Sequence, residues 1–470
     1  MLVLIRRLLQ FVGLLPSDIS NGDRPVTVAQ PPVATNVRWS VFSLAFATSA
    51  LLYLHRYVFG FIKPVLPKEW GLSKTDLGRI DSDFAACYTL FQFPLAIAAD
   101  AVGVHLVLTG LIVVWCSGLA LMAWAPSAKV LWFGQVTLGT GQSAVYACLN
   151  RVSRTWFPPA VRTTMQGAVG ILAGRLGALS SGLVFAVLLV DMLKFDWRTA
   201  IWILVAVGVI HLLLFATMFR NSPREHPRVN DAEARLIEGD VSSAAGSTVA
   251  VPKRMSVATM FRSMTPRSLL NLIWLSLQNV LSTFADNIYL SWIPLFLSEV
   301  HHLEFKKMGL YSALPLLGGA LAGIVGGHLN DLWITRTGNR RWARSGVGFL
   351  GKGMAAALMF AALMFYDRPY VFCTFLFFIK LFGDWSLTSS WGVVSDIGGR
   401  ATASVFAFSN TVAGIAFIAA PRVFGYVAEH HGWRPVFVIV GVTYALCALS
   451  WLAIDCTIPV LREAASADES

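Results

Sequence analysis

Long apolar runs are the feature that most constrains what this chain can fold into. Of its 470 residues, 56% are hydrophobic and 13% are charged, whereas a soluble domain usually carries about 25% charged residues. A helix that crosses a membrane needs about 20 mostly apolar residues. Twelve stretches meet that need: 38–62, 82–103, 104–126, 129–149, 165–192, 196–219, 268–297, 308–330, 345–366, 369–396, 401–427 and 433–457. We therefore predict an all-α integral membrane protein with twelve transmembrane helices.

The spans fall into two groups of six that are separated by a polar segment. We expect an N-terminal six-helix bundle over 38–219, a cytoplasmic linker over 220–267 and a C-terminal six-helix bundle over 268–457. Residues 1–37 and 458–470 are expected to form cytoplasmic tails. Two matching halves are typical of secondary transporters, whose substrate site lies near the middle of the membrane between the repeats.

The distribution of basic residues predicts the orientation of the chain. It carries 37 Lys and Arg against 26 Asp and Glu, a net charge of +11. With both termini in the cytoplasm, 21 Lys and Arg residues lie on that side and 11 on the other, as the positive-inside rule requires. This asymmetry, rather than nucleic-acid binding, explains the positive charge, and we expect a cell membrane or bacterial inner membrane. The six cysteines lie in or beside apolar runs and predict buried hydrophobic side chains, with no metal site and no cofactor.

One charged side chain lies in the middle of the first span. Arg56 interrupts the apolar stretch LLYLHRYVFG. A charge at the bilayer centre costs ~2.5–3.5 kcal/mol on insertion scales, so such a residue is a candidate functional site. Tyr53 lies three residues earlier and therefore on the same helix face. Two interpretations of Arg56 stay open: it binds an anionic solute, or it snorkels or pairs with an acid of its own bundle.

Several segments together resemble the major facilitator superfamily, and within it the anion:cation symporter family of sialin-like and sugar-acid transporters. These segments are GGHLNDLWITRTGNRR (326–341), FRNSPREHPRVNDAEARLI (219–237), NRVSRTWFPP (150–159), and FDWR and HGWRP before the sixth and twelfth spans. The resemblance covers residues 38–460 and implies two bundles that expose a central site alternately to either side of the membrane. It also implies gating or structural roles for Asp100, Asp331 and Arg336 in or beside cytoplasmic loops.

The resemblance implies a substrate-binding set in which an arginine holds the substrate carboxylate: Arg56, Tyr88, Gln142, Arg175, Tyr289 and Asn410. Tyr53 and Trp391 join this set because each is a polar or flat aromatic group within a span, although aromatic packing explains them equally well. Arg175 has the alternative of pairing with a neighbouring acid. Lys380 and Asp384 are four residues apart, so they are expected to neutralise each other on one helix face.

Ion coupling is where the chain departs from the family pattern. The family's proton-carrying acids are replaced by His55 in the first span and by Gln142 in the fourth, and a glutamine cannot titrate. His55, Asp81 and Asp83 are the remaining candidates for coupling. The alternative for the two aspartates is a hydrated end of the second span. Proton symport, uncoupled carriage and exchange all stay open.

The sequence thus predicts a secondary active transporter that moves a small organic anion, such as a sugar acid, by alternating access. We expect it to work as a monomer in the lipid bilayer. The alternative is a membrane sensor that binds the anion without moving it, because the usual coupling acids are missing. An enzyme is not expected, because the chain contains no GxxxxGK[ST], HExxH or GxSxG motif.

Overall fold

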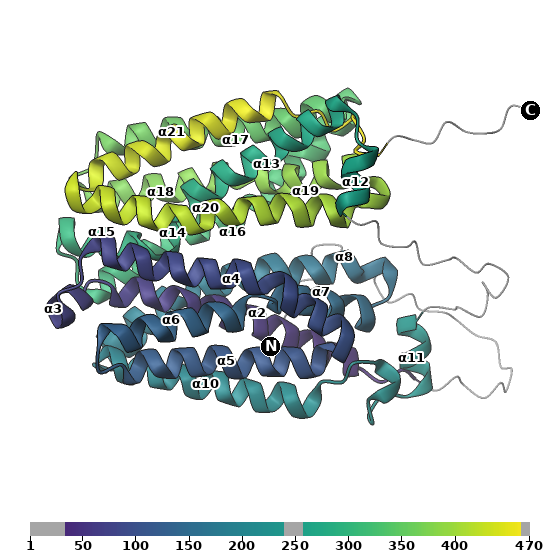
Figure 1. Cartoon of the computed structure of the whole chain (residues 1–470), viewed down its shortest axis with the longest axis horizontal. Coiled ribbons are helices and arrows are strands. Elements are labelled where there is room, and N and C mark those ends of the chain that lie inside the picture. Colours follow the sequence, from purple (N-terminus) through teal and green to yellow (C-terminus); the bar gives the residue numbers. More distant parts are fainter. Residues whose placement is uncertain (1–32, 239–256, 462–470) are drawn as a thin grey trace, which may run out of the picture.

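The computed structural model describes residues 33–238 and 257–461. The predicted tail residues 1–32 and 462–470, and the linker residues 239–256, lie outside the described residues. Within the described ranges every regular element is a helix, and the helices form two bundles that lie side by side (Figure 1). The first bundle runs from purple to teal in the sequence colours, and the second from green to yellow.

The first bundle contains the helices before the linker. They are α2 (Val37–Ile62), α3 (Leu66–Trp70), α4 (Lys74–Val102), α5 (Val104–Trp124), α6 (Ala128–Gln142), α7 (Val145–Trp156), α8 (Pro159–Gly167), η1 (Ala168–Leu172), α9 (Ala173–Ser180), η2 (Ser181–Met192) and α10 (Trp197–Met218). The elements α8, η1, α9 and η2 follow one another without a break, and together they cross the bundle as one rod whose η segments are π-helical.

The second bundle contains the helices after the linker. They are α12 (Val257–Ser263), α13 (Pro266–Asp286), α14 (Ile288–Ser291), α15 (Ile293–His301), α16 (Phe305–Thr337), α17 (Arg340–Leu363), α18 (Pro369–Gly383), α19 (Trp385–Gly398), η5 (Gly399–Ala401), α20 (Thr402–His430) and α21 (Trp433–Leu452). Two broken rods, α13–α14–α15 and α18–α19, place polar residues at their breaks, namely Asn287 and Asp384.

Two short helices, η3 (Pro223–Glu225) and α11 (Asp231–Glu238), follow the first bundle in the chain, and α11 reaches the start of α2. The buried Glu233 carboxylate accepts backbone N–H groups from Val37 at 3.1 Å and Arg38 at 3.0 Å. These N–H groups belong to the first turn of α2, where no helical carbonyl is available to accept them. The FRNSPREHPRVNDAEARLI segment therefore caps the first membrane helix.

The predicted twelve-helix architecture is confirmed, with one interruption that the apolar pattern conceals. Among the described residues, eleven helices are long and apolar enough to cross a membrane. The predicted span at 129–149 is not one of them, because α6 ends at Gln142 and α7 begins at Val145. The two short helices together make the remaining crossing.

The second membrane helix begins earlier than the sequence predicts. Hydropathy places its start at residue 82, but α4 begins at Lys74. The Ser73 hydroxyl accepts the backbone N–H of Asp76 at 3.0 Å, so a capping box starts the helix in a polar stretch. Asp81 and Asp83 consequently lie about two turns inside α4, and not at its end.

The segment GGHLNDLWITRTGNRR is mostly helical and not a loop. Most of it forms the end of α16, which continues to Thr337. Only Gly338 and Asn339 connect α16 to α17, and Gly338 takes the left-handed conformation with φ of 66°. Asp331 and Arg336 are exposed residues of α16.

Close packing between α5 and α6 depends on Gly118. A Cβ atom at this position would come within 2.5 Å of the Leu138 backbone nitrogen and 2.7 Å of the Gly134 carbonyl oxygen. Backbone atoms cannot swing aside as a side chain can, so the helices would have to separate. Gly110 lies on the same helix, but a Cβ atom there would meet nothing within 4 Å.

We expect Gly118→Ala to destabilise the protein by ~1–3 kcal/mol through overpacking. Gly110→Ala is the matched control and should leave stability unchanged or slightly raised, because alanine favours a helix. Apparent melting temperatures of the two variants in the same detergent provide the measurement. Equal melting temperatures would contradict the packing argument.

Candidate functional site

A cavity of about 400 Å³ lies between the two bundles. The first bundle contributes Arg56 and Tyr57 from α2, whereas most of the polar wall comes from the second bundle. That wall contains Asn279, Ser282, Thr283, Asp286, Asn287, Ser390, Ser409 and Asn410. Trp391 and Phe406 contribute apolar surface. A concave site with a few convergent polar groups is the usual form of a small-molecule site.

Arg56 reaches this cavity from α2, six residues before the helix ends at Ile62. Its Nε donates to Oε1 of Gln142 at 2.9 Å, and the Gln142 amide nitrogen donates to the Leu52 carbonyl at 3.1 Å. The second hydrogen bond fixes which end of the amide faces the guanidinium. Gln142 thus stands where the family pattern has an acid, but it brings no negative charge to Arg56.

Three aromatic rings surround the same guanidinium. The Cζ atom of Arg56 lies 5.1 Å from the ring centroid of Tyr53, 5.5 Å from that of Phe84 and 4.7 Å from that of Tyr88. These distances allow cation–π attraction, which is weaker than pairing with a carboxylate. The Nη2 atom is buried and has no hydrogen-bond partner in the described part of the chain, where Arg56 also forms no ion pair. The guanidinium therefore keeps one donor, Nη2, without a partner beside the cavity that Arg56 lines.

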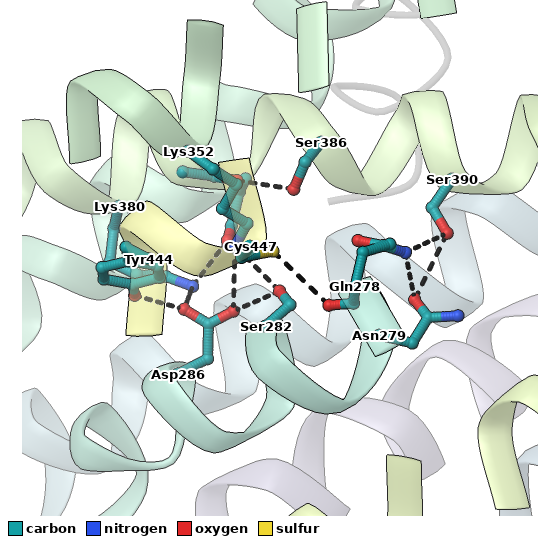
Figure 2. Close-up of polar contacts among 12 residues, drawn as sticks. Gln278, Asn279, Ser282, Asp286, Lys352, Lys380, Ser386, Ser390, Tyr444 and Cys447 are labelled. Carbon is teal, nitrogen blue, oxygen red and sulfur yellow. Dashed lines mark hydrogen bonds and ion pairs between the residues drawn. The ribbon is translucent and has the colours of Figure 1, made fainter. Parts of the chain in front are cut away.

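Five ionisable residues form a charge cluster beside the cavity: Arg175, Asp286, Lys352, Lys380 and Asp384 (Figure 2 shows three of them). The Lys380 ammonium lies 2.9 Å from Oδ1 of Asp286 and 2.6 Å from Oδ1 of Asp384. The Lys352 ammonium lies 3.6 Å from Oδ2 of Asp286. Both lysine side chains are almost wholly buried, so the carboxylates are what keep these charges in the protein interior.

The charge cluster also connects the two bundles. Arg175 of α9 donates through Nη2 to Oδ2 of Asp384 at 2.6 Å. The predicted pairing of Lys380 with Asp384 is present, and the alternative that Arg175 pairs with a neighbouring acid is what the structure shows. Arg175 is not among the residues that line the 400 Å³ cavity.

A second ion pair lies where the bundles meet, at the end of the molecule that carries α3 and α15 (left in Figure 1), which we call the closed end. Lys63 follows α2, is fully buried and lies 2.5 Å from Oδ2 of Asp81. Both groups hydrogen-bond Ser291 of the second bundle, at 2.9 Å from Lys63 and 2.6 Å from Asp81. The Lys63 ammonium also lies 3.7 Å from the centroid of a Trp292 ring. One buried ion pair of the first bundle thus holds two residues of the second.

The other predicted coupling residues lie away from the cavity. Asp83 accepts from Arg422 at 3.0 Å and from the indole N–H of Trp132 at 2.9 Å. His55 is fully buried beside the ring of Trp115, and neither of its ring nitrogens has a hydrogen-bond partner among the described residues. Neither Asp83 nor His55 lines the cavity.

The remaining predicted site residues are divided between the cavity and its surroundings. Trp391 and Asn410 line it. Tyr289 is buried behind the wall, 5.3 Å from the Lys380 ammonium measured to its ring centroid. Asp100 forms an ion pair with Arg151 of α7, so this acid has a basic partner although Ala101 replaces the family's arginine.

The sequence alone does not indicate that Asp286, Lys352 and Lys63 contact charged partners. Asp286 and Lys352 lie within the predicted spans 268–297 and 345–366, and Lys63 directly follows the first predicted span. Their spacing in the sequence gives no indication of pairing, because 66 residues separate Asp286 from Lys352. A charge inside an apolar span was the available signal, and it indicated candidates without their partners.

Comparisons with known proteins agree with this architecture. Residues 45–355 and 308–468 match the family model described as Major Facilitator Superfamily. A probable sulfoacetate transporter of Cupriavidus necator is 32% identical over 418 residues, which cover 86% of this chain and 91% of that protein. The hexuronate transporter of Bacillus subtilis is 23% identical, with 83% of this chain and 88% of that protein covered.

Among solved structures, a bacterial homologue of the human lysosomal transporter Spinster, in an inward-facing and unoccupied conformation, superposes with a TM-score of 0.71. The alignment covers 89% of this chain and 97% of that structure at 16% sequence identity. At this identity the likeness concerns the fold.

The buried pair at the closed end makes a sharp stability prediction. Asp81→Asn leaves the Lys63 ammonium buried without a carboxylate, which typically costs ~3–5 kcal/mol. The double variant Lys63→Met with Asp81→Asn removes both charges and keeps an oxygen that can accept from Ser291. We expect a large fall in melting temperature for the single variant and recovery of most of it in the double variant. A double variant as unstable as the single one would show that the ion pair is not the cause.

Proposed function

The chain belongs to the Major Facilitator Superfamily, and we propose that it is a secondary transporter that binds a small organic anion at Arg56 and moves it by alternating access. The observation that supports this most strongly is the free Nη2 donor of a cavity-lining guanidinium that has no ion pair in the described residues. An uncompensated charge inside the hydrocarbon layer is expensive, so a resident cation of this kind favours a negatively charged guest.

We propose a substrate with an anionic group at one end and a second polar group at the other. A guanidinium offers forked donors that fit a carboxylate or sulfonate. Across the cavity, Ser409 and Asn287 present buried polar atoms without partners in the described structure, and Asn410 and Ser390 lie beside them. These amides and hydroxyls suit the hydroxyls of a sugar acid or the second acid group of a sulfocarboxylate. Sulfoacetate and hexuronates, which the names of the two relatives give as their substrates, each combine an anionic group with a second polar end.

The remaining predicted residues take supporting roles in this proposal. Gln142 and the rings of Tyr53 and Tyr88 hold the guanidinium in place, and Trp391 offers a flat wall to the substrate. Arg175 and Tyr289, behind the wall, act through the charge cluster.

We further propose that both termini are cytoplasmic and that the closed end faces the outside of a cell membrane or bacterial inner membrane. The 21-to-11 distribution of basic residues supports this orientation. Asp100 with its partner Arg151, and Asp331 and Arg336 at the end of α16, would then lie at the cytoplasmic face, where the gating role proposed for them belongs. One chain forms the whole cavity, which supports a functional monomer.

Transport by purified protein in liposomes tests the proposal, with labelled sulfoacetate and D-glucuronate as probes. Arg56→Gln keeps a hydrogen-bonding side chain but removes the charge, and it should reduce uptake by ~10- to 100-fold, as expected for a charge-assisted hydrogen bond. Arg56→Lys keeps the charge but loses the fork, so we expect an intermediate loss.

Arg434→Gln is the matched control, because this exposed arginine pairs with Asp367 at the protein surface. It should transport as the unchanged protein does. Wild-type uptake by Arg56→Gln would contradict the proposed anion site. Binding of a probe without any flux, measured by thermal shift, would favour the membrane sensor instead.

A further inference from the structure

We propose that Asp286, on the second bundle, is the site that takes up the coupling proton of this transporter. The inference rests on the proposed function, because it assigns a driving ion to the same anion site. It concerns a residue that neither the family pattern nor the sequence-based candidates His55, Asp81 and Asp83 indicated. Asp286 ends α13, where the rod α13–α14–α15 breaks.

Asp286 is the one carboxylate among the described residues that line the cavity. Its side chain is 26% exposed, so water and a proton can reach it from the cavity. The other carboxylates of the membrane region are placed differently. Asp384 is buried behind the wall, Asp81 is held by Lys63 at the closed end, and Asp83 is paired with Arg422.

Four side chains contact the Asp286 carboxylate from behind and beside the wall (Figure 2). Lys380 and Lys352 provide ammonium groups at 2.9 and 3.6 Å. The Tyr444 hydroxyl donates to Oδ1 at 2.7 Å, and the Ser282 hydroxyl donates to Oδ2 at 3.2 Å. These partners come from α17, α18, α21 and α13 itself, so the carboxylate is fixed in place while one side remains open to the cavity.

Other ionisable groups face this cluster from the packed helices. Arg56 and Tyr57 of α2 line the opposite wall, Tyr289 of α14 lies next to Lys380, and Cys447 of α21 donates to the Gln278 carbonyl near Lys352. Helix α20 contributes only uncharged residues without a titratable group to the cavity wall, namely Phe406, Ser409, Asn410, Ala413 and Phe417. No further carboxylate among the described residues of the wall competes for the proton.

The charges around the cavity explain why a proton and an anion would bind together. With its lysines protonated, the charge cluster has three cations and two carboxylates, a net charge of +1. Arg56 adds another positive charge. A proton on Asp286 of the empty protein would add a third, which is unfavourable in a low-dielectric interior. A monoanion at Arg56 removes one positive charge and a proton on Asp286 restores it, so the empty and the loaded site carry the same charge.

The bound anion also acts directly on Asp286. Like charges in one cavity disfavour the ionised carboxylate, so anion binding increases its proton affinity, and by linkage the proton increases anion affinity. Protonation would release Lys380 from Asp286 and leave it to Asp384 alone. Asp384 holds Arg175 of the first bundle, so the proton state of the cavity wall is connected to an ion pair between the bundles.

Liposomes containing the full chain test this proposal with D-glucuronate, a monoanion, and sulfoacetate as probes. Counterflow exchange at equal pH requires only binding and alternating access, whereas accumulation driven by a pH gradient also requires the proton. One proton per monoanion allows up to ~tenfold accumulation for one pH unit. We expect Asp286→Asn to retain exchange and to lose pH-driven accumulation, with no proton movement reported by an internal pH dye.

Because Asp286→Asn leaves the buried Lys352 without a carboxylate, whereas Lys380 keeps Asp384, a second variant protects the test against misfolding. Asp286→Asn with Lys352→Met removes one charge of each sign and should also exchange without accumulating. Asp367→Asn, an exposed carboxylate outside the bundles' interior, is the control and should accumulate both probes normally.

Three outcomes would overturn the inference. Accumulation by an exchanging Asp286 variant would move the proton site elsewhere. If the unchanged protein exchanges the probes at equal pH but does not accumulate them under a pH gradient, proton coupling is excluded and the organic-anion function stands. Failure of the unchanged protein to exchange either probe would remove the proposed function, and the proton site with it.

Discussion

The free-energy cost of holding a charge in the hydrocarbon layer explains how the buried cations of this protein are placed. Lys352, Lys380 and Arg175 each contact at least one of the two carboxylates of the charge cluster, and Lys63 pairs with Asp81. Arg56 differs, because its hydrogen-bond acceptor is the neutral amide of Gln142. The other buried cations are explained by the protein's own acids. Among these cations, Arg56 alone contacts no carboxylate of the described structure, and it lies on the cavity wall.

The sequence was sufficient for those features that depend on single residues or short spacings. Apolar runs predicted the architecture, because membrane thickness fixes helix length. A charged residue in such a run predicted Arg56 as a candidate without reference to the fold. The pair Lys380 and Asp384 followed from helical spacing alone, since residues four apart share one face.

The sequence was insufficient wherever a partner comes from another helix. Asp286 meets Lys352 only because α13 and α17 are turned toward each other, and no local pattern encodes that rotation. Lys63 is a related example. A charged residue just beyond an apolar span is expected to be exposed to solvent. The Lys63 side chain is instead fully buried, because it contacts Asp81 and Ser291. The start of α4 was misplaced because its capping box is polar and lowers the local hydropathy.

Two of the contacts between the bundles, those of the Lys63–Asp81 pair and of the Arg175–Asp384 pair, differ in the free energy that separating the bundles would cost. Lys63 and Asp81 both belong to the first bundle, so parting the bundles breaks their contacts with Ser291 and Trp292 but leaves the buried pair intact. The pairs Lys74–Glu299 and Asp83–Arg422 do join the bundles, but they are partly exposed and therefore weaker. A hydrogen bond to a charged group or a cation–π contact is worth ~1–3 kcal/mol, less than separating opposite charges in a dry interior. Such a joint can hold firmly and still open. The Arg175–Asp384 pair joins opposite charges across the bundles, so it suits a pivot that stays closed while the ends part.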